Sequence, residues 1–105
     1  MQQKLVFRGG KIVLPDAVMQ GDLVVENGKI TELSSCAATD GCRVVDVSGR
    51  VLLPGGIDSH VHVTEPSPNS GREDWTTASR SAAAGGVTTI VQMPVNDPPI
   101  SNRAN

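Results

Sequence analysis

The sequence predicts an α/β chain made of two parts, a strand-only part over residues 1–54 and an α/β part over residues 55–105. Two observations favour this division. Short β-prone runs separated by turn residues fill the first part, whereas the second part changes from a strand period to a helical period and back. The boundary falls at Pro54-Gly55-Gly56, where proline and glycine end the last β-prone run.

Three consecutive hairpins are expected in the first part, which is typical of a portion of a β-sandwich. Asn-Gly suits a type I′ turn, which needs positive φ at both central residues, and this register pairs Glu26 with Lys29. No residue of this part is expected to carry chemistry. Each hairpin joins two β-prone runs through a pair that contains glycine: 4–8 and 11–14 at Gly9-Gly10, two runs within 22–33 at Asn27-Gly28, and 43–47 and 50–53 at Ser48-Gly49.

The second part predicts a strand, a helix and a second strand. A helical crossover makes neighbouring strands parallel, so these elements form one β-α-β unit. The second strand is almost entirely β-prone, which is typical of a strand buried on both faces. The expected elements are a strand over 57–63, a helix from a capping box at Ser70 and Glu73 to the glycine pair Gly85-Gly86, and a strand over 87–93.

Charge and apolar pattern exclude several classes of partner. Nine Lys+Arg against eleven Asp+Glu give a net charge of -2, which does not favour nucleic acid. No apolar run reaches the ~20 residues that span a bilayer, and the N-terminus lacks a signal-peptide pattern. Cys36 and Cys42 are expected to be reduced loop residues. We therefore expect a cytoplasmic protein that binds neither nucleic acid nor membrane.

The chemistry of the sequence lies in an Asp-x-His-x-His strand. His60 and His62 alternate onto one face, with Cα atoms ~6.6 Å apart, so their imidazoles are aimed at one divalent cation. Asp58 lies on the same face and is expected to orient a metal-bound ring. A polar strand face that only meets water is the alternative. The position at the carboxyl end of a parallel strand favours the metal site, because ligand sites of α/β folds lie there.

The run Pro54-Gly-Gly-Ile-Asp-Ser-His-Val-His62 resembles the start of the catalytic barrel in the amidohydrolase superfamily, and the cyclic amidohydrolase branch is the most similar. The resemblance implies that residues 55–105 begin a metal-dependent (β/α)₈ TIM barrel. That fold typically needs ~250 residues, so a truncated, N-terminal fragment is expected. The supporting motifs are Glu65-Pro66, the segment 71–75, the segment 82–89 and Met93-Pro-Val-Asn96.

The same resemblance implies two divalent ions, with Zn²⁺ the first choice, and His60 and His62 as ligands of the more buried ion. These are the only two His of the chain, and a catalytic zinc takes three protein ligands. The other ligands and the catalytic aspartate are therefore expected downstream, no catalytic residue is assigned in this chain, and the fragment alone is expected to be inactive. Asn96, after the second strand, is a candidate substrate-binding residue, with a turn role equally open.

Among the cyclic amidohydrolases the sequence most resembles allantoinases, which hydrolyse the cyclic amide bond of allantoin to allantoate in purine catabolism. Dihydroorotases usually carry an Arg where this sequence has Thr64, and Arg-to-Thr removes a carboxylate partner. The alternatives are a dihydroorotase or a dihydropyrimidinase/hydantoinase-like hydrolase, and, from another class, a non-catalytic scaffold or a small β-rich interaction module. The expected partners are a small cyclic amide or ureide substrate and further copies of the parent in a homo-oligomer, a tetramer.

Overall fold

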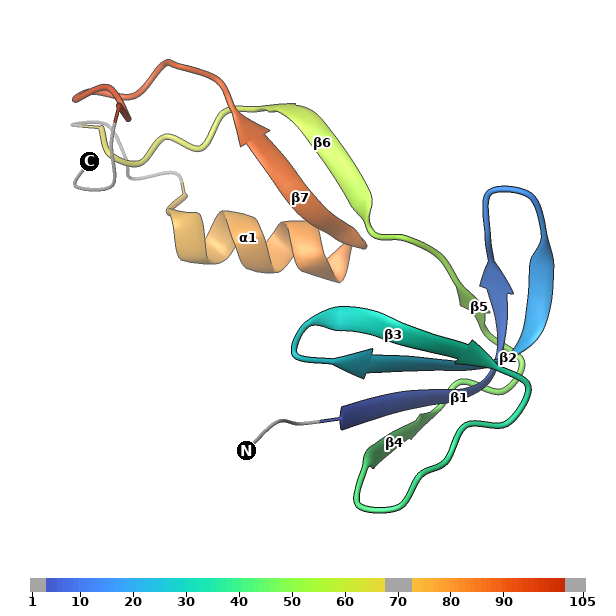
Figure 1. Ribbon diagram of the computed structural model, residues 1–105. Coiled ribbons are helices and arrows are strands. Elements are labelled where there is room, and N and C mark those ends of the chain that lie inside the picture. The colour runs from blue at the N-terminus through green and yellow to red at the C-terminus, as the bar shows by residue number, and fades with distance from the viewer. Residues whose placement is uncertain (1–3, 68–72, 102–105) are drawn as a thin grey trace. The chain divides into compact units, whose positions relative to one another are not determined.

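A computed structural model describes residues 4–67 and 73–101 of the chain. The chain divides into two compact units, residues 1–54 and 55–105, and each is described by itself. Both units contain strands, and the helix belongs to the second (Figure 1). Within the described ranges, no helix has the length and apolar character needed to cross a bilayer.

The first unit is a five-stranded sheet with the order β3-β2-β1-β4, in which β5 also pairs with β1 (Figure 1). The pairs β1–β2 and β2–β3 are antiparallel, whereas β4 and β5 run parallel to β1. The strands are β1 (Lys4–Val13), β2 (Val18–Glu26), β3 (Lys29–Ser34), β4 (Arg43–Asp46) and β5 (Val51–Leu52).

The hairpin at Asn27-Gly28 is confirmed. Both residues have positive φ, 52° and 74°, as a type I′ turn requires. Glu26 pairs with Lys29 across the turn, in the register that the sequence predicted. This turn is local, because two adjacent residues determine its geometry.

The hairpin expected at Gly9-Gly10 is wrong, because β1 runs through both glycines as a single strand with an irregular register. Gly9 has a φ of 75°, and its N–H donates to Asp22 Oδ1 at 2.9 Å. The carboxylate on β2 therefore stabilises a bulge where we expected a reversal. The chain reverses later, where Leu14 N–H donates to Ala17 O at 2.8 Å.

The third expected hairpin is also wrong, because β4 and β5 pair with β1 and not with each other. Val47 N–H donates to Arg8 O at 2.9 Å, and Lys11 N–H donates to Arg50 O at 2.9 Å. Both sides of the turn thus stay on the same edge of β1. Gly49, with a φ of 74°, supplies the turn that the sequence indicated, but the chain continues in its original direction.

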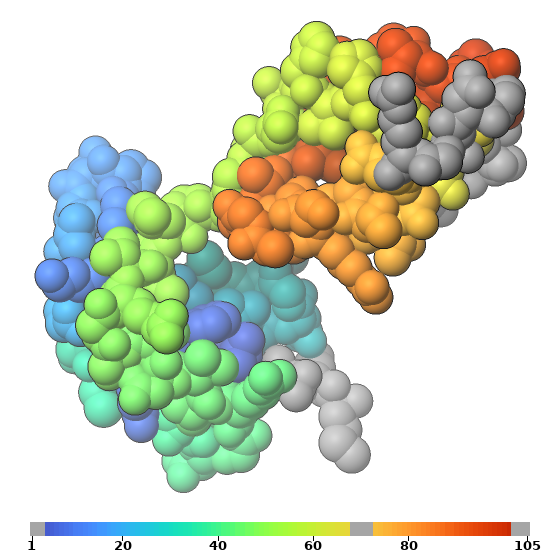
Figure 2. All heavy atoms as spheres, turned by 180° about the vertical axis from the view of Figure 1, so that it is seen from behind, coloured from blue at the N-terminus to red at the C-terminus, as the bar shows by residue number. Residues whose placement is uncertain are grey.

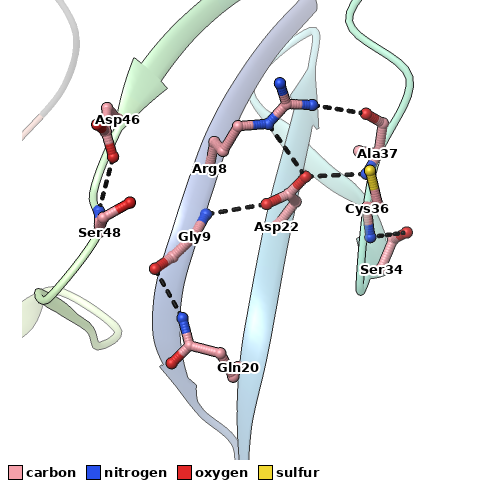
Figure 3. A network of polar contacts seen from close by, with 9 residues as sticks. All are labelled: Arg8, Gly9, Gln20, Asp22, Ser34, Cys36, Ala37, Asp46 and Ser48. Carbon is pink, nitrogen blue, oxygen red and sulfur yellow. Dashed lines mark hydrogen bonds and ion pairs between the residues drawn. The ribbon is translucent and has the colours of Figure 1, made fainter.

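The interior of the first unit combines small apolar side chains with one buried carboxylate. Val6 and Val24 are fully buried and pack with Ala37. Asp22 is 3% exposed and accepts hydrogen bonds from the backbone N–H of Ala37 and from Gly9, each at 2.9 Å (Figure 3). This arrangement ties three segments of the unit to one side chain.

Arg8 completes the network around Asp22 (Figure 3). Its Nε lies 3.5 Å from Asp22 Oδ2, and its Nη2 donates to Ala37 O at 3.0 Å. The hydrogen bond from Ala37 N–H, followed by that from Gly9 and the charge of Arg8, lowers the pKa of Asp22 from its ordinary value of 3.8 against the opposing effect of burial. Asp22 is therefore held in its ionised form.

The second unit is a β-α-β unit, as predicted (Figure 1). Its elements are β6 (Gly56–Val61), α1 (Trp75–Ala84) and β7 (Val87–Gln92). β6 and β7 pair in parallel, and the last register pair joins Val61 to Gln92. Val61 and Gln92 therefore lie at the carboxyl ends of the two strands, the end at which ligand sites of α/β folds are found.

Helix α1 begins at a capping box different from the one predicted. Asp74 is the N-cap: its Oδ1 accepts from Thr77 N–H at 2.6 Å, and its own N–H donates to Thr77 Oγ1 at 3.0 Å. Ser70 of the expected box lies outside the described residues. Trp75 N–H donates to Glu65 Oε2 at 2.7 Å. The helix therefore begins about one turn later than the sequence predicted, after Asp74 and not after Ser70. The helix ends at the predicted glycine pair, where Gly86 has a φ of 82°.

The faces of the second unit are open. No residue of α1 is buried, and in the space-filling view the orange atoms of α1 lie at the surface (Figure 2). The expectation that β7 is buried on both faces is wrong for this structure, since none of its residues is buried. The reason is that β7 pairs with one strand, β6, and is covered by one helix among the described residues.

Candidate metal centre

The two histidines lie together at the carboxyl end of β6. His60 is in the strand and His62 follows its last residue, so the alternation of the extended backbone places both rings on one face. Their Nε2 atoms are 3.2 Å apart, and the ring centroids are 5.1 Å apart at an interplanar angle of 64°. Both residues are exposed.

This spacing fits a shared divalent ion. Two nitrogens bound to one tetrahedral zinc at ~2.0–2.1 Å lie about 3.3 Å apart, close to the distance in this structure. Imidazole nitrogen is also a ligand of the chemical type that zinc and its neighbouring transition metals accept. Without an ion, the same two atoms form an N–H···N hydrogen bond when one ring carries its proton on Nε2.

Asp58 acts on the backbone of the same strand. Its Oδ1 accepts a hydrogen bond from His60 N–H at 3.1 Å, within the stretch where the β6–β7 register is irregular. The contact is to the amide of His60 and not to the ring that we expected Asp58 to orient. Its role beside a bound ion stays a prediction.

Two nitrogens are fewer than a catalytic zinc needs. In the part of the chain that the structure describes, no three His, Cys, Asp or Glu side chains gather in a group able to hold a metal ion. A catalytic zinc takes three protein ligands and one water. If His60 and His62 bind a zinc of this kind, they supply two of its three protein ligands.

Asn96 is buried, 7% exposed, and its side chain is engaged within the protein. Its Nδ2 donates to Val63 O and to Glu65 O, each at 2.9 Å, and its Oδ1 accepts from Gln92 Nε2 at 2.8 Å. Both amide hydrogens are used in this way, which leaves only acceptor capacity on Oδ1. In this structure Asn96 holds the loop after β6, and its substrate-binding role stays a prediction.

Gln92 and Glu65 hold the segment that follows the histidine pair, and the sequence analysis did not include either residue in the candidate site. Gln92 Oε1 accepts from Val63 N–H at 2.8 Å, and Gln92 Nε2 donates to Val63 O at 3.0 Å. Glu65 accepts two hydrogen bonds from Trp75. The backbone N–H of Trp75 donates to the carboxylate of Glu65, and Trp75 Nε1 donates to its backbone carbonyl at 2.8 Å. The sequence signal that could have identified Gln92 is its position, since a side-chain amide there ends the β-prone run 87–91.

Thr64 lies between Val63 and Glu65, which are both held by side-chain hydrogen bonds. Its Oγ1 is buried and has no hydrogen-bond partner among the described residues. A buried hydroxyl left in this way is uncommon in native structures. It lies two residues beyond His62, in the segment that follows the histidine pair.

A parallel β-α-β unit that carries two converging imidazoles at the carboxyl end of its first strand is typical of the metal-dependent α/β enzymes. A family model described as dihydro-orotase-like matches residues 49–104. Because this match covers more than half of the 105 residues, the chain belongs to the dihydro-orotase-like family, within the amidohydrolase superfamily.

Individual relatives agree with this assignment. A dihydroorotase of Aquifex aeolicus is 40% identical over 94% of this chain and 24% of its own length. An allantoinase of Streptomyces avermitilis is 40% identical over 97% of this chain and 23% of its own length. The solved L-hydantoinase (dihydropyrimidinase) of Arthrobacter aurescens superposes with a TM-score of 0.78 at 30% identity, over 97% of this chain and 23% of its own. The chain thus spans about a quarter of the length of these relatives.

Proposed function

We propose that this chain supplies the first metal-binding strand of a metal-dependent cyclic amidohydrolase, with His60 and His62 as ligands of the more buried of two divalent ions, Zn²⁺ first. The observation that carries the proposal is the 3.2 Å separation of the two Nε2 atoms, which suits two ligands of one ion. The family assignment supports the same chemistry. The catalytic residues and remaining ligands are expected outside residues 1–105.

The residues of this chain hold and orient parts of the site. A bound divalent ion supplies an activated water and a Lewis acid for the carbonyl of an amide. His60 and His62 would supply nitrogen ligands to this ion. Asp58 fixes the backbone just before them, because its carboxylate accepts a hydrogen bond from His60 N–H. Hydrolysis of a cyclic amide consumes one water: the ring C–N bond breaks, the carbonyl carbon becomes a carboxylate, and the released nitrogen takes up a proton.

Allantoin is the first-ranked substrate. Relatives named allantoinase support it, and Thr64 replaces the Arg that dihydroorotases usually carry at this position. A dihydroorotase-type activity is the second candidate, and the 40% identity to the Aquifex aeolicus dihydroorotase favours it. We further propose a cytoplasmic parent that assembles as a homo-tetramer.

We assign residues 1–54 to a portion of a β-sandwich and residues 55–105 to the start of a (β/α)₈ barrel. An apolar pocket in the first unit supports the sandwich, since one side of its sheet carries exposed large side chains. Ile30 and Leu53, which line this pocket, are 63% and 66% exposed. An apolar sheet face of this kind is ordinarily covered by a second layer.

A chimera tests the proposed function. We would replace the matching N-terminal segment of the Streptomyces avermitilis allantoinase with residues 1–105, and likewise in the Aquifex aeolicus dihydroorotase. The expected result is zinc-dependent hydrolysis of allantoin by the first chimera, lost on chelation and in both His60→Ala and His62→Ala. The second chimera compares dihydroorotate under the same conditions.

The outcomes separate the alternatives. Activity that survives both histidine substitutions overturns the ligand assignment. Turnover of dihydroorotate but not allantoin replaces the first-ranked substrate with the second. Metal-dependent turnover by the 105-residue chain alone contradicts the expectation that its ligand set is incomplete.

A further inference from the structure

The β6–β7 ladder ends just before the second histidine. Its final backbone bond runs from Met93 N–H to Val61 O at 2.8 Å. Pro94 follows and has no N–H to donate, and Val95 N–H turns back to Met93 O at 2.9 Å. The backbone after β7 is therefore diverted from Val63, the residue directly after His62.

Two side chains take the place of the missing ladder bonds. Val63, which is fully buried, donates its N–H to Gln92 Oε1 at 2.8 Å, and its carbonyl accepts from Gln92 Nε2 at 3.0 Å and from Asn96 Nδ2 at 2.9 Å. A bond of 2.8 Å between Gln92 Nε2 and Asn96 Oδ1 joins the two amides. We call the side chains of Gln92 and Asn96 the amide clamp.

We propose that the amide clamp positions His62 as a metal ligand, an inference that rests on the proposed metal site. The backbone is fixed on both sides of His62, by the ladder at Val61 and by the clamp at Val63. The ring of His62 is exposed, so packing does little to orient it, and its direction follows from the backbone that carries it. Gln92 and Asn96 are positioning residues, because they act through Val63.

The clamp also extends beyond the histidine. Asn96 Nδ2 bonds Glu65 O, the same carbonyl that accepts from Trp75 Nε1 at the start of α1. The segment from Val63 to Glu65 is thus held from β7 and from α1 together. His62 lies outside strand β6, but these side-chain bonds hold its backbone as ladder bonds would hold a residue within the strand. Residues that position metal ligands typically contribute 10–100-fold to metal affinity.

The test uses the 105-residue chain and Zn²⁺ alone. The chain has only two His, so its histidine ring signals in NMR report His60 and His62 without further labelling. The wild type is expected to shift both ring signals together on zinc binding. Gln92→Leu is expected to weaken zinc binding about 10-fold or more. With Cu²⁺ as the probe, pulsed EPR is expected to show two imidazoles in the wild type and one in Gln92→Leu.

Two further variants grade the effect. Asn96→Ala leaves the two Gln92–Val63 bonds in place and is expected to weaken binding less than Gln92→Leu. Gln92→Glu keeps an acceptor for Val63 N–H but loses the donor, so its zinc affinity is expected between that of Gln92→Leu and that of the wild type. Because these variants alter the clamp in steps, the test does not depend on a single substitution that disrupts folding.

Thr77→Ala is the matched control, since it removes the bonds between the Thr77 hydroxyl and Asp74 in the same unit without touching the clamp. The bond from the backbone N–H of residue 77 to Asp74 Oδ1 is kept. It is expected to lower stability and to leave zinc affinity within about twofold of the wild type. If Gln92→Leu and Asn96→Ala bind zinc through both rings with wild-type affinity, the positioning role is overturned while the metal site stands. If Thr77→Ala weakens binding as much as Gln92→Leu, the positioning role is also overturned. If the wild type never engages both rings, this inference is overturned, whereas the metal site is judged separately by the His60→Ala and His62→Ala chimeras.

Discussion

The two units of the chain place their buried residues differently. In the first unit, Val6 and Val24 form an apolar interior beside the buried carboxylate of Asp22, and none of these residues belongs to the candidate site. Among the described residues of the second unit, the buried ones are Val63 and Asn96, and both lie in the network that follows the histidine pair. The first unit thus uses burial for its own stability, whereas the second concentrates it at the candidate site.

The substitution expected to have the largest effect on stability is Asp22→Ala, which tests the role of burial in the first unit. The substitution leaves the N–H groups of Gly9 and Ala37 without their acceptor, and unsatisfied buried donors cost about 1–3 kcal/mol each. We expect the first unit to lose about 3 kcal/mol or more of stability. Urea denaturation followed by the amide signals of Val6 and Val24 measures the loss.

Asp16→Asn is the control for Asp22→Ala, because it changes an exposed aspartate in the turn before β2. It is expected to change stability by less than about 0.5 kcal/mol. Equal effects of the two substitutions would show that the buried network does not hold the first unit together. If Asp22→Ala, but not Asp16→Asn, also loses the amide signals of β6 and α1, then Asp22 stabilises both units and the proposed difference between them is contradicted.

The second prediction concerns acid. The pKa of Asp22 is lowered in the folded chain, chiefly by the hydrogen bond from Ala37 N–H. The stability that this carboxylate contributes is fully present above its ordinary pKa of 3.8, and it is lost as the pH falls through the lower folded value. Urea midpoints of the first unit between pH 6 and pH 2 are expected to fall steeply below about pH 4.

Asp22→Asn isolates this contribution, because the amide does not ionise. Its urea midpoint is expected to start lower at pH 6 and to converge with that of the wild type at pH 2. Parallel pH profiles for the two proteins would count against the role given to Asp22. Carboxylates elsewhere affect both proteins equally and cancel in the comparison.

The third prediction concerns the start of α1. Glu65→Ala removes the carboxylate that accepts Trp75 N–H, and loss of such an N-terminal acceptor costs about 1 kcal/mol. Thermal unfolding followed by circular dichroism of the helix measures it. Glu73→Ala, an exposed acidic neighbour of the same helix end, is the control and is expected to have a smaller effect. Equal losses would remove Glu65 from the anchoring of this segment.

The smallest effect is expected for Thr64→Val. The Thr64 hydroxyl is buried without a partner among the described residues, so its replacement by a methyl group of similar size is expected to be neutral or to stabilise by up to about 1 kcal/mol. A melting temperature that rises or stays constant agrees with this. A clear loss of stability would show that the hydroxyl has a partner in solution, and Thr64→Ser then tests whether that partner is retained.

The features that the sequence predicted correctly are those set by near neighbours. Asn27-Gly28 determines its turn from two adjacent residues, and the alternation of an extended strand places His60 and His62 on one face. The β-α-β order and the glycine end of α1 follow from the change of period and from Gly86. In each case the physical cause lies within a few residues of its effect.

The features that it missed depend on contacts between distant residues. The bulge at Gly9 depends on a carboxylate thirteen positions away, and Gln92 reaches Val63 across 29 positions. The parallel pairing of β4 and β5 with β1 likewise requires β1 as a third partner. Local propensity contains none of this information, which explains why turn signals at Gly9-Gly10 and Ser48-Gly49 were interpreted as hairpins.

The clamp on Val63 also bears on how such a site can be changed. Every residue except proline can form both kinds of backbone ladder bond, so a substitution by a residue other than proline rarely shifts the end of a strand that these bonds hold. The bonds from Gln92 and Asn96 come from side chains, and each is altered by one codon. Shortening Gln92 by one methylene, as in Gln92→Asn, changes the reach of the clamp and leaves the backbone groups that form the β6–β7 ladder in place. The spacing of the two histidines is therefore open to adjustment by directed evolution in small, separate steps.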